Sequence, residues 1–154
     1  MSEADLRHVF LTRMRAFGLA HRIESPMESG VPDVVCLLKQ QFLKADGTLP
    51  VYSNEGKVSW VELKHAHEWP KRPGTKFRFP KFTMEQLSWL KEWHRSGGRC
   101  CVVGQVATTY FLVGGIKNLE HLYDGINRSN LGMIAQVINE KVFPTRRVLK
   151  WLTE

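Results

Sequence analysis

The sequence predicts an α/β or α+β domain in which helices flank a mixed β-sheet. Two observations lead to this prediction: segments with helical periodicity alternate with short β-branched runs, and turn residues separate them. The 154 residues, of which 43% are hydrophobic, suffice for one domain with a substantial core. We expect a single domain over residues 1–154, in which residues 115–154 form a helical C-terminal extension.

The first half of the chain is expected to hold one helix and two main strands. Hydrophobic residues recur near the helical period over residues 2–17, and Ser2 can cap the start of that helix. β-Branched residues predict strands at 33–40 and 58–65. The intervening segment carries an Asp46-Gly47 turn signal, which predicts an antiparallel connection, with or without a further short strand.

The second half begins with a long loop over residues 68–82 and a helix that Thr83 opens. Thr83 and Gln86 fit a capping box, and a Gly-Gly pair fits the helix end. The runs "RCCVVGQV" and "TYFLVGG" predict two strands joined by a tight turn. The remaining tail predicts one or two helices with a break at Pro144.

Composition limits the functional classes. The formal net charge of +7 favours a polyanionic partner, nucleic acid first and a membrane surface second. No hydrophobic run approaches the roughly 20 residues that cross a bilayer, and the N-terminus lacks the pattern of a signal peptide, so we expect a cytoplasmic protein. The three cysteines lack disulfide or zinc spacing, which predicts reduced, buried thiols.

Three charged residues at strand positions suggest a site. Glu62 and Lys64 are two residues apart in "VSWVELKHA", so a strand places both on one face, with its hydrophobic residues on the other. Pro32 pushes the preceding residue to an extended conformation, so Asp33 begins the earlier strand. If these two strands are neighbours, the three side chains converge. Otherwise Asp33 is a turn residue, and the other two form a solvated face of an edge strand.

Such a trio suits metal-assisted hydrolysis of phosphodiesters. Two carboxylates supply the hard oxygen ligands that Mg²⁺ or Mn²⁺ prefers. The metal lowers the pKa of a water and shields developing charge. Lys64 could orient or deprotonate that water, or stabilise charge on the phosphoryl group.

Gly30-Val31-Pro32-Asp33 followed by Glu62-Leu63-Lys64 resembles the PD-(D/E)XK nuclease superfamily. The order of elements is similar to VRR-NUC and to phage or archaeal Holliday-junction-resolvase-like nucleases, over residues 2–113. This resemblance implies an α/β fold with a restriction-endonuclease-like central mixed sheet flanked by helices. It also implies Asp33 and Glu62 as metal ligands, Lys64 as the catalytic lysine, and a bacterial or phage-infected cell as the host.

The resemblance implies further site residues. An acidic residue near the start of the first helix also approaches the metal in this pattern, and Glu3 matches it. Glu24 is a rival for that place. Related nucleases carry a glutamine on the helix after the lysine strand, and Gln86 matches it, although Gln86 could serve only to cap its helix.

The loop over residues 68–82 combines basic and aromatic residues. Basic side chains neutralise phosphates and aromatic side chains stack on unpaired bases; alternatively, the aromatics pack the loop down and the charges only solvate it. The candidate nucleic-acid-binding residues are Lys71, Arg72, Lys76, Arg78 and Lys81.

We therefore expect a Mg²⁺- or Mn²⁺-dependent DNA endonuclease, structure-specific, acting on duplex, branched or partly single-stranded DNA. A homing or restriction-type sequence-specific endonuclease is an alternative, and so is a non-catalytic nucleic-acid-binding module with the same fold. Cutting two symmetric strands would need a homodimer. No membrane partner is expected.

Overall fold

The computed structural model describes residues 2–25, 27–39, 41–43, 50–52 and 57–154. The elements in chain order are α1 (Glu3–Met14), the 3₁₀ helix η1 (Arg15–Phe17), β1 (Gly18–Arg22), β2 (Val34–Leu38), β3 (Gln41–Leu43), β4 (Pro50–Tyr52), β5 (Lys57–Ala66), α2 (Met84–Arg95), β6 (Arg99–Val106), β7 (Thr109–Gly114), α3 (Ile116–Asp124), α4 (Arg128–Ile134), β8 (Val137–Glu140) and α5 (Thr145–Thr153).

The central sheet has six strands in the order β1-β2-β5-β6-β7-β8. The pair β5–β6 is parallel, whereas the other neighbouring pairs of this sheet are antiparallel. The chain returns from β5 to β6 through α2, as a parallel crossover requires. The strands β3 and β4 form a separate antiparallel ribbon.

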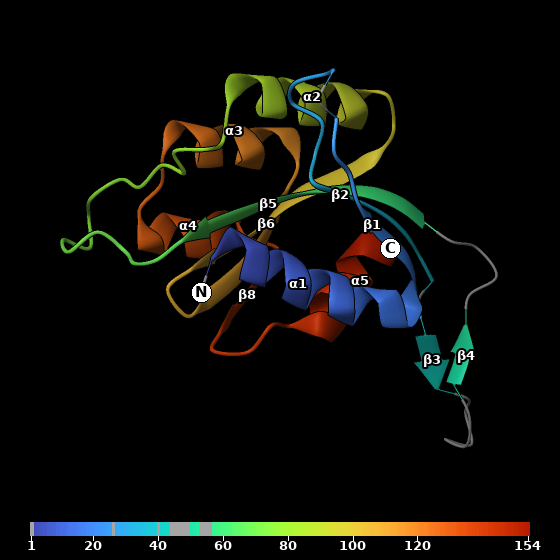
Figure 1. Ribbon diagram of the computed structural model, residues 1–154. Helices are drawn as coiled ribbons and strands as arrows, with labels where there is room; N and C mark the ends of the chain where they lie inside the picture. The colour runs from blue at the N-terminus through green and yellow to red at the C-terminus, as the bar shows by residue number, and fades with distance from the viewer. Residues whose placement is uncertain (1, 26, 40, 44–49, 53–56) are drawn as a thin grey trace.

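Helices cover both faces of the sheet (Figure 1). On one face α1 and α5 bury a core that includes Phe10, Val61, Leu63 and Leu152. On the other face α2, α3 and α4 bury a second core with side chains from β6 and β7. The expected α/β architecture, a mixed sheet flanked by helices, is therefore confirmed.

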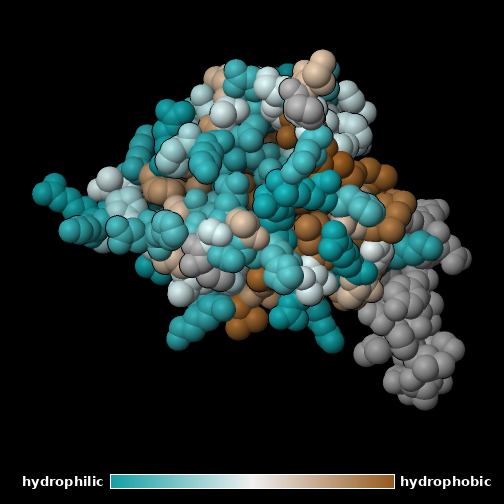
Figure 2. Space-filling view, viewed as in Figure 1, coloured by the Kyte–Doolittle hydropathy of each residue, from teal (hydrophilic) through white to brown (hydrophobic). Residues whose placement is uncertain are grey.

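The hydropathy of the surface reflects these layers. Polar side chains cover much of the face seen in Figure 2, and hydrophobic side chains reach the surface on the side where β1 and β2 lie. Leu19 pairs with Leu37, which pairs with Val58, and all three are exposed. The helices thus leave this corner of the sheet uncovered.

Most elements match their sequence signals. Ser2 caps α1 in a capping box with Asp5, and Thr83 caps α2 in a capping box with Gln86. The sequence left open whether a further short strand lies between the two main strands. The structure has two such strands, β3 and β4, which pair with each other. The Asp46-Gly47 turn signal lies outside the described residues.

The tail differs from the prediction of one or two helices. It contains three helices and the strand β8, which pairs antiparallel with β7. The strand has four residues, "VINE", too few to establish an alternating pattern against the helical signals on either side. Pro144 stands at the start of α5 and not within a helix.

The cysteine prediction is confirmed: Cys36, Cys100 and Cys101 are free and buried. Within the part of the chain that the structure describes, no helix has the length and hydrophobicity needed to cross a membrane.

Candidate active site

The pairing of β2 with β5 brings Asp33 to Glu62. Val34 is the partner of Val61, so the residue before β2 lies level with the residue after Val61. Oδ2 of Asp33 accepts a hydrogen bond of 2.9 Å from the backbone N–H of Leu63. Asp33 is therefore fixed to the strand that carries the other charged residues.

Glu62 and Lys64 are buried side chains of a central strand. Glu62 is 0% exposed and Lys64 is 3% exposed, and β5 lies between β2 and β6. The interpretation as a solvated face of an edge strand is therefore wrong. As predicted from the alternation, Val61 and Leu63 point to the opposite face, where they join the core under α1 and α5.

The two carboxylate oxygens of Glu62 differ in their hydrogen bonds. Oε1 accepts hydrogen bonds from Nζ of Lys64 at 2.6 Å and from Nε2 of Gln86 at 2.7 Å. Oε2 is buried and accepts no hydrogen bond from any residue in the described ranges. Nζ of Lys64 also donates to the backbone carbonyl of Lys81 at 3.1 Å, which ties the site to the loop over residues 68–82.

The environment of Glu62 disfavours its charge. Burial raises the pKa of this carboxyl from an ordinary value of 4.5 to about 8, because the ionised form loses its hydration. Lys64 lowers this pKa, whereas the neighbouring carboxyl of Asp33 raises it. Without a cation, Glu62 therefore binds a proton at neutral pH.

The two carboxyl groups fit a hard divalent cation. A buried carboxylate oxygen without a hydrogen bond, beside a second carboxylate, is a position that a cation would stabilise. Across residues 2–25, 27–39 and 57–154, no group of three His, Cys, Asp or Glu residues forms a metal site. Mg²⁺ needs only one or two protein carboxylates, because water and substrate phosphate supply the remaining ligands. Asp33 and Glu62 would hold the ion.

Gln86 has both of the contacts that the sequence left as alternatives. Its Oε1 accepts a hydrogen bond of 3.0 Å from the backbone N–H of Thr83, which completes the cap of α2. The same amide donates through Nε2 to Glu62. The cap therefore holds the amide in the orientation that contacts Glu62.

Gly30 fixes the loop before Asp33 against α2, a role that sequence reasoning missed. Its φ is +87°, and a Cβ there would lie 2.5 Å from the backbone oxygen of Glu85. Only glycine allows this approach without strain. The signal was present as the glycine of the "GVPD" motif.

The two candidates for a third acidic residue lie in different surroundings. Glu3, in the first turn of α1, lines a cavity of about 280 Å³ with Lys64, His65 and His67. Glu24 is exposed and forms an ion pair with Arg22 at 2.7 Å. The contact of Glu24 with Arg22 is therefore an ion pair on the surface.

The loop over residues 68–82 is packed by its aromatic residues. Phe79 and Phe82 are buried in the core under α2 and α3, so they are not free to stack on bases. Phe77 forms a backbone bridge with Ile126. The candidate basic residues are exposed: Lys71, Arg72, Lys76, Arg78 and Lys81.

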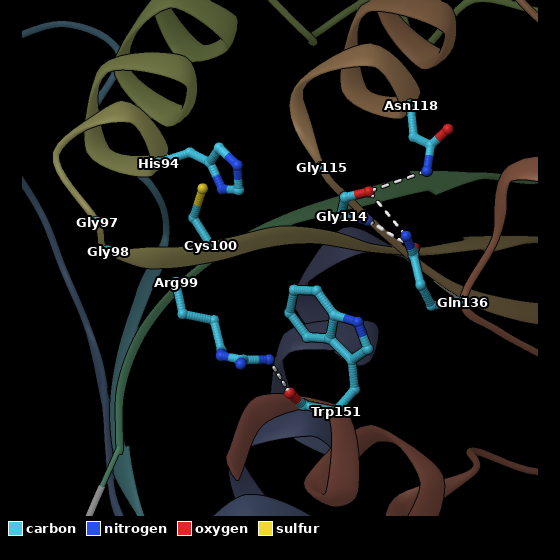
Figure 3. A pocket seen from close by; sticks show the side chains of 10 residues that line it. All are labelled: His94, Gly97, Gly98, Arg99, Cys100, Gly114, Gly115, Asn118, Gln136 and Trp151. Carbon is cyan, nitrogen blue, oxygen red and sulfur yellow. Dashed lines mark hydrogen bonds between the residues drawn. The ribbon is translucent and has the colours of Figure 1, made fainter. Parts of the chain in front are cut away.

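A separate cavity of about 510 Å³ lies where β6 begins and β7 ends (Figure 3). Its polar side chains bind the backbone around them: Gln136 contacts both the N–H and the carbonyl of Gly114, and Arg99 donates to the carbonyl of Trp151. Among the residues that the structure describes, no carboxylate lines this cavity. This cavity is therefore distinct from the arrangement of Asp33, Glu62 and Lys64.

Comparisons with known proteins add a likeness among solved structures. No protein-family model matches the sequence, and no curated protein matches it. Among solved structures, the chain is similar to the 1.6 Å resolution structure of Archaeoglobus fulgidus Hjc, a Holliday junction resolvase from an archaeal hyperthermophile. The two share 14% sequence identity with a TM-score of 0.49, and the match covers 92% of this chain and 97% of that one.

Proposed function

We propose that this protein is a divalent-metal-dependent DNA endonuclease of PD-(D/E)XK type. One observation carries the proposal: the buried carboxyl of Glu62 lies beside Asp33, receives hydrogen bonds from Lys64 and Gln86, and has one oxygen without a partner in the described part of the chain. Buried charged groups persist when they pair or bind a metal.

Asp33 and Glu62 would hold the cation, with Mg²⁺ or Mn²⁺ as the candidates. When bound, such an ion lowers the pKa of a water and neutralises charge on a phosphate. The hydrogen bond from Leu63 orients Asp33, and those from Lys64 and Gln86 orient Glu62. The site is therefore organised before substrate arrives.

Lys64 is the proposed catalytic lysine. Its side chain contacts Glu62 on one side and lines the cavity with Glu3 on the other. A phosphate in that cavity would lie against the ammonium group, which would stabilise the charge that develops on the phosphoryl oxygens. Glu3 is the proposed third acidic residue, because it lines the same cavity.

The exposed basic residues of the loop over residues 68–82 are the proposed DNA backbone contacts. The carbonyl of Lys81 in this loop accepts a hydrogen bond from Lys64, so DNA held by the loop would pass close to the site. The net charge of +7 adds a sequence-independent attraction for phosphates. Branched DNA is the first substrate to test, because the motif order resembles Holliday-junction-resolvase-like nucleases.

The decisive experiment measures cleavage of labelled linear, single-stranded and four-way-junction DNA in Mg²⁺, Mn²⁺ or EDTA. The wild type should cut in either metal and not in EDTA, and Lys64→Ala should lose at least ~100-fold in rate. Lys117→Ala is the matched control, because Lys117 is an exposed lysine on α3 and should retain the wild-type rate.

Preferential cutting of the junction would establish structure specificity. Cutting of linear duplex at defined sequences would instead establish a sequence-specific endonuclease. If the wild type binds these DNAs and cuts none of them in any metal, the endonuclease proposal fails.

A further inference from the structure

The ammonium group of Lys64 has three close neighbours. Its Nζ donates to Oε1 of Glu62 at 2.6 Å and to the backbone carbonyl of Lys81 at 3.1 Å. The same atom lies over the ring of Phe82, 5.9 Å from the ring centroid. Lys81 and Phe82 are consecutive residues of the loop over residues 68–82, so one short stretch of this loop supplies two of the three contacts.

An ammonium group has three N–H donors, and the contacts of Lys64 use two of them. In the described part of the chain, Glu62 and Lys81 are the acceptors within hydrogen-bond distance of Nζ. Lys64 also lines the cavity of about 280 Å³ next to Glu3. One donor is therefore available to an acceptor that enters this cavity, such as a phosphate oxygen.

The ring of Phe82 is itself fixed in place. Phe82 is 3% exposed and belongs to the core under α2 and α3. Its backbone N–H donates to the carbonyl of Phe79 at 3.0 Å, which closes a tight turn before α2. The ring of Tyr123, on α3, stands edge to face with the ring of Phe82, with centroids 5.8 Å apart. Contacts within the loop and with α3 thus determine where the ring lies.

The same aromatic pair contacts one of the exposed basic residues of the loop. The guanidinium group of Arg78 lies over the ring of Tyr123, 4.9 Å from the ring centroid. Arg78 is one of the residues proposed to contact the DNA backbone. A proposed DNA contact and the proposed catalytic lysine therefore lie against two rings that also contact each other.

An aromatic ring can hold an ammonium group in a way that an aliphatic side chain cannot. The face of the ring is negative and attracts the cation, and this attraction is stronger where water is excluded, as it is around the buried Lys64. A lysine side chain has a flexible four-carbon stem, so its ammonium group moves unless its neighbours hold it. Misplacing a reacting group by about 1 Å can cost about 100-fold in rate.

We propose that Phe82 is a positioning residue for Lys64: its ring, together with the carbonyl of Lys81, holds the ammonium group at Glu62 and leaves one N–H donor for a phosphate oxygen of the substrate. The inference rests on the proposed function. It gives the loop over residues 68–82 a role in arranging the catalytic lysine, in addition to the DNA contacts proposed for its basic residues.

The first test compares single-turnover cleavage of DNA in Mg²⁺ by the wild type and Phe82→Leu. Leucine keeps a hydrophobic side chain at this position and removes the ring. The rate at saturating DNA should fall about threefold to thirtyfold, the value of a cation–π contact. The DNA concentration that gives half of the maximal rate should stay within about twofold of the wild-type value, because the substitution leaves the proposed DNA contacts in place.

A graded series keeps the test decisive if Phe82→Leu does not fold. Phenylalanines that carry one, two or three ring fluorines weaken the negative face of the ring in steps and change its size little. When they replace Phe82, the logarithm of the rate at saturating DNA should fall with each added fluorine. A ring that only filled space would give no such trend.

Phe143 is the matched control. Its ring is also buried, and it stands edge to face with Phe10 and Tyr110 in the core under α1 and α5. Phe143→Leu should lower stability, but it should keep the cleavage rate at saturating DNA within about twofold. Fluorination at position 143 should leave the rate unchanged.

The contact can also be measured without cleavage, by urea unfolding in EDTA. Lys64→Met removes the ammonium group and keeps an unbranched side chain. Phe82→Leu should raise the equilibrium constant for unfolding about threefold to tenfold more in the protein with Lys64 than in the Lys64→Met protein. Equal effects in the two proteins would overturn the inference, whatever the protein cleaves.

The outcomes separate this inference from the proposed function. A wild type that cuts DNA at a rate independent of ring fluorination at position 82 would overturn the positioning role, and so would a folded Phe82→Leu protein that cuts at the wild-type rate. In both cases the endonuclease proposal stands. A wild type that cuts no DNA in any metal would overturn the proposed function, and the positioning role with it.

Discussion

Nε2 of Gln86 lies 2.7 Å from Oε1 of Glu62, so the residue that caps α2 also contacts the buried carboxylate. The helix start and the candidate site therefore depend on the same side chain. Thr83 shares the cap, because its hydroxyl accepts a hydrogen bond from the backbone N–H of Gln86. Comparing mutations of Thr83 and Gln86 therefore separates the capping role of Gln86 from its contact with Glu62.

Thr83→Ala should cost about 1 kcal/mol of stability, the usual value of an N-cap, and leave the cleavage rate within about twofold. Gln86→Ala should cost at least as much stability and should also lower the cleavage rate about 10-fold or more, because Glu62 loses a donor. Urea unfolding and single-turnover cleavage measure the two effects. Equal rates for both variants would restrict Gln86 to capping.

The raised pKa of Glu62 predicts how stability depends on pH without metal. Between the ordinary pKa of 4.5 and the folded value of about 8, the folded protein binds one more proton at this carboxyl than the unfolded chain does. The free energy of unfolding should therefore fall as pH rises through this window, by up to about 1.4 kcal/mol per pH unit. Glu62→Gln cannot titrate, so the fall should be smaller in that variant when both are unfolded by urea in EDTA.

The same carboxyl links metal binding to pH. Below pH 8 a divalent ion must displace the proton of Glu62, so the apparent affinity for Mn²⁺ or Mg²⁺ should rise with pH by up to tenfold per unit. Above pH 8 the affinity should level off. Isothermal titration calorimetry in buffers of different ionisation enthalpy measures the released proton. Metal binding with no proton release at pH 6.5 would contradict the assignment of Glu62 as a ligand.

Gly30→Ala tests the contact between the "GVPD" loop and α2. The new Cβ would lie 2.5 Å from the backbone oxygen of Glu85, at a φ of +87° that disfavours alanine. We expect a loss of about 1–3 kcal/mol in stability and weaker metal binding, because Asp33 would shift. Gly74→Ala is the matched control, since among the described residues other than its chain neighbours no atom lies within 4 Å of its Cβ position.

The basic loop can be tested through the salt dependence of DNA binding. Each lysine or arginine that neutralises a phosphate contributes about 0.9 to the slope of log affinity against log salt for duplex DNA. Lys71→Ala with Arg72→Ala should therefore lower that slope by up to about 2, without a change in the cleavage rate at saturating DNA. An unchanged slope would mean that these exposed charges are only solvated.

Features that depend on local sequence patterns could be predicted, whereas features that depend on pairing between distant segments could not. The capped helices and the two charged strands follow from residue spacing alone, because each depends on interactions within a few residues. The strand β8 could not be predicted, because its four residues become a strand only by pairing with β7. Pairing of this kind depends on tertiary context.

The candidate site shows the same limit. The spacing of Glu62 and Lys64 predicts a shared face, and the structure places them there. Their burial could not be read from the sequence, because it depends on β5 being central and on α2 covering it. Likewise, the sequence offered Glu3 and Glu24 as rivals, and only the packing of α1 puts Glu3 in the lining of a cavity that Lys64 also lines.

The placement of Glu62 and Lys64 on β5 has a consequence for motion. This strand pairs with neighbours on both sides, so its backbone amides should exchange with solvent only when the whole domain unfolds. The proposed chemistry would then be carried by the slowest-exchanging part of the chain. Any adjustment to a bulky branched substrate would come from the surrounding loops, and activity should persist in denaturant until global unfolding begins.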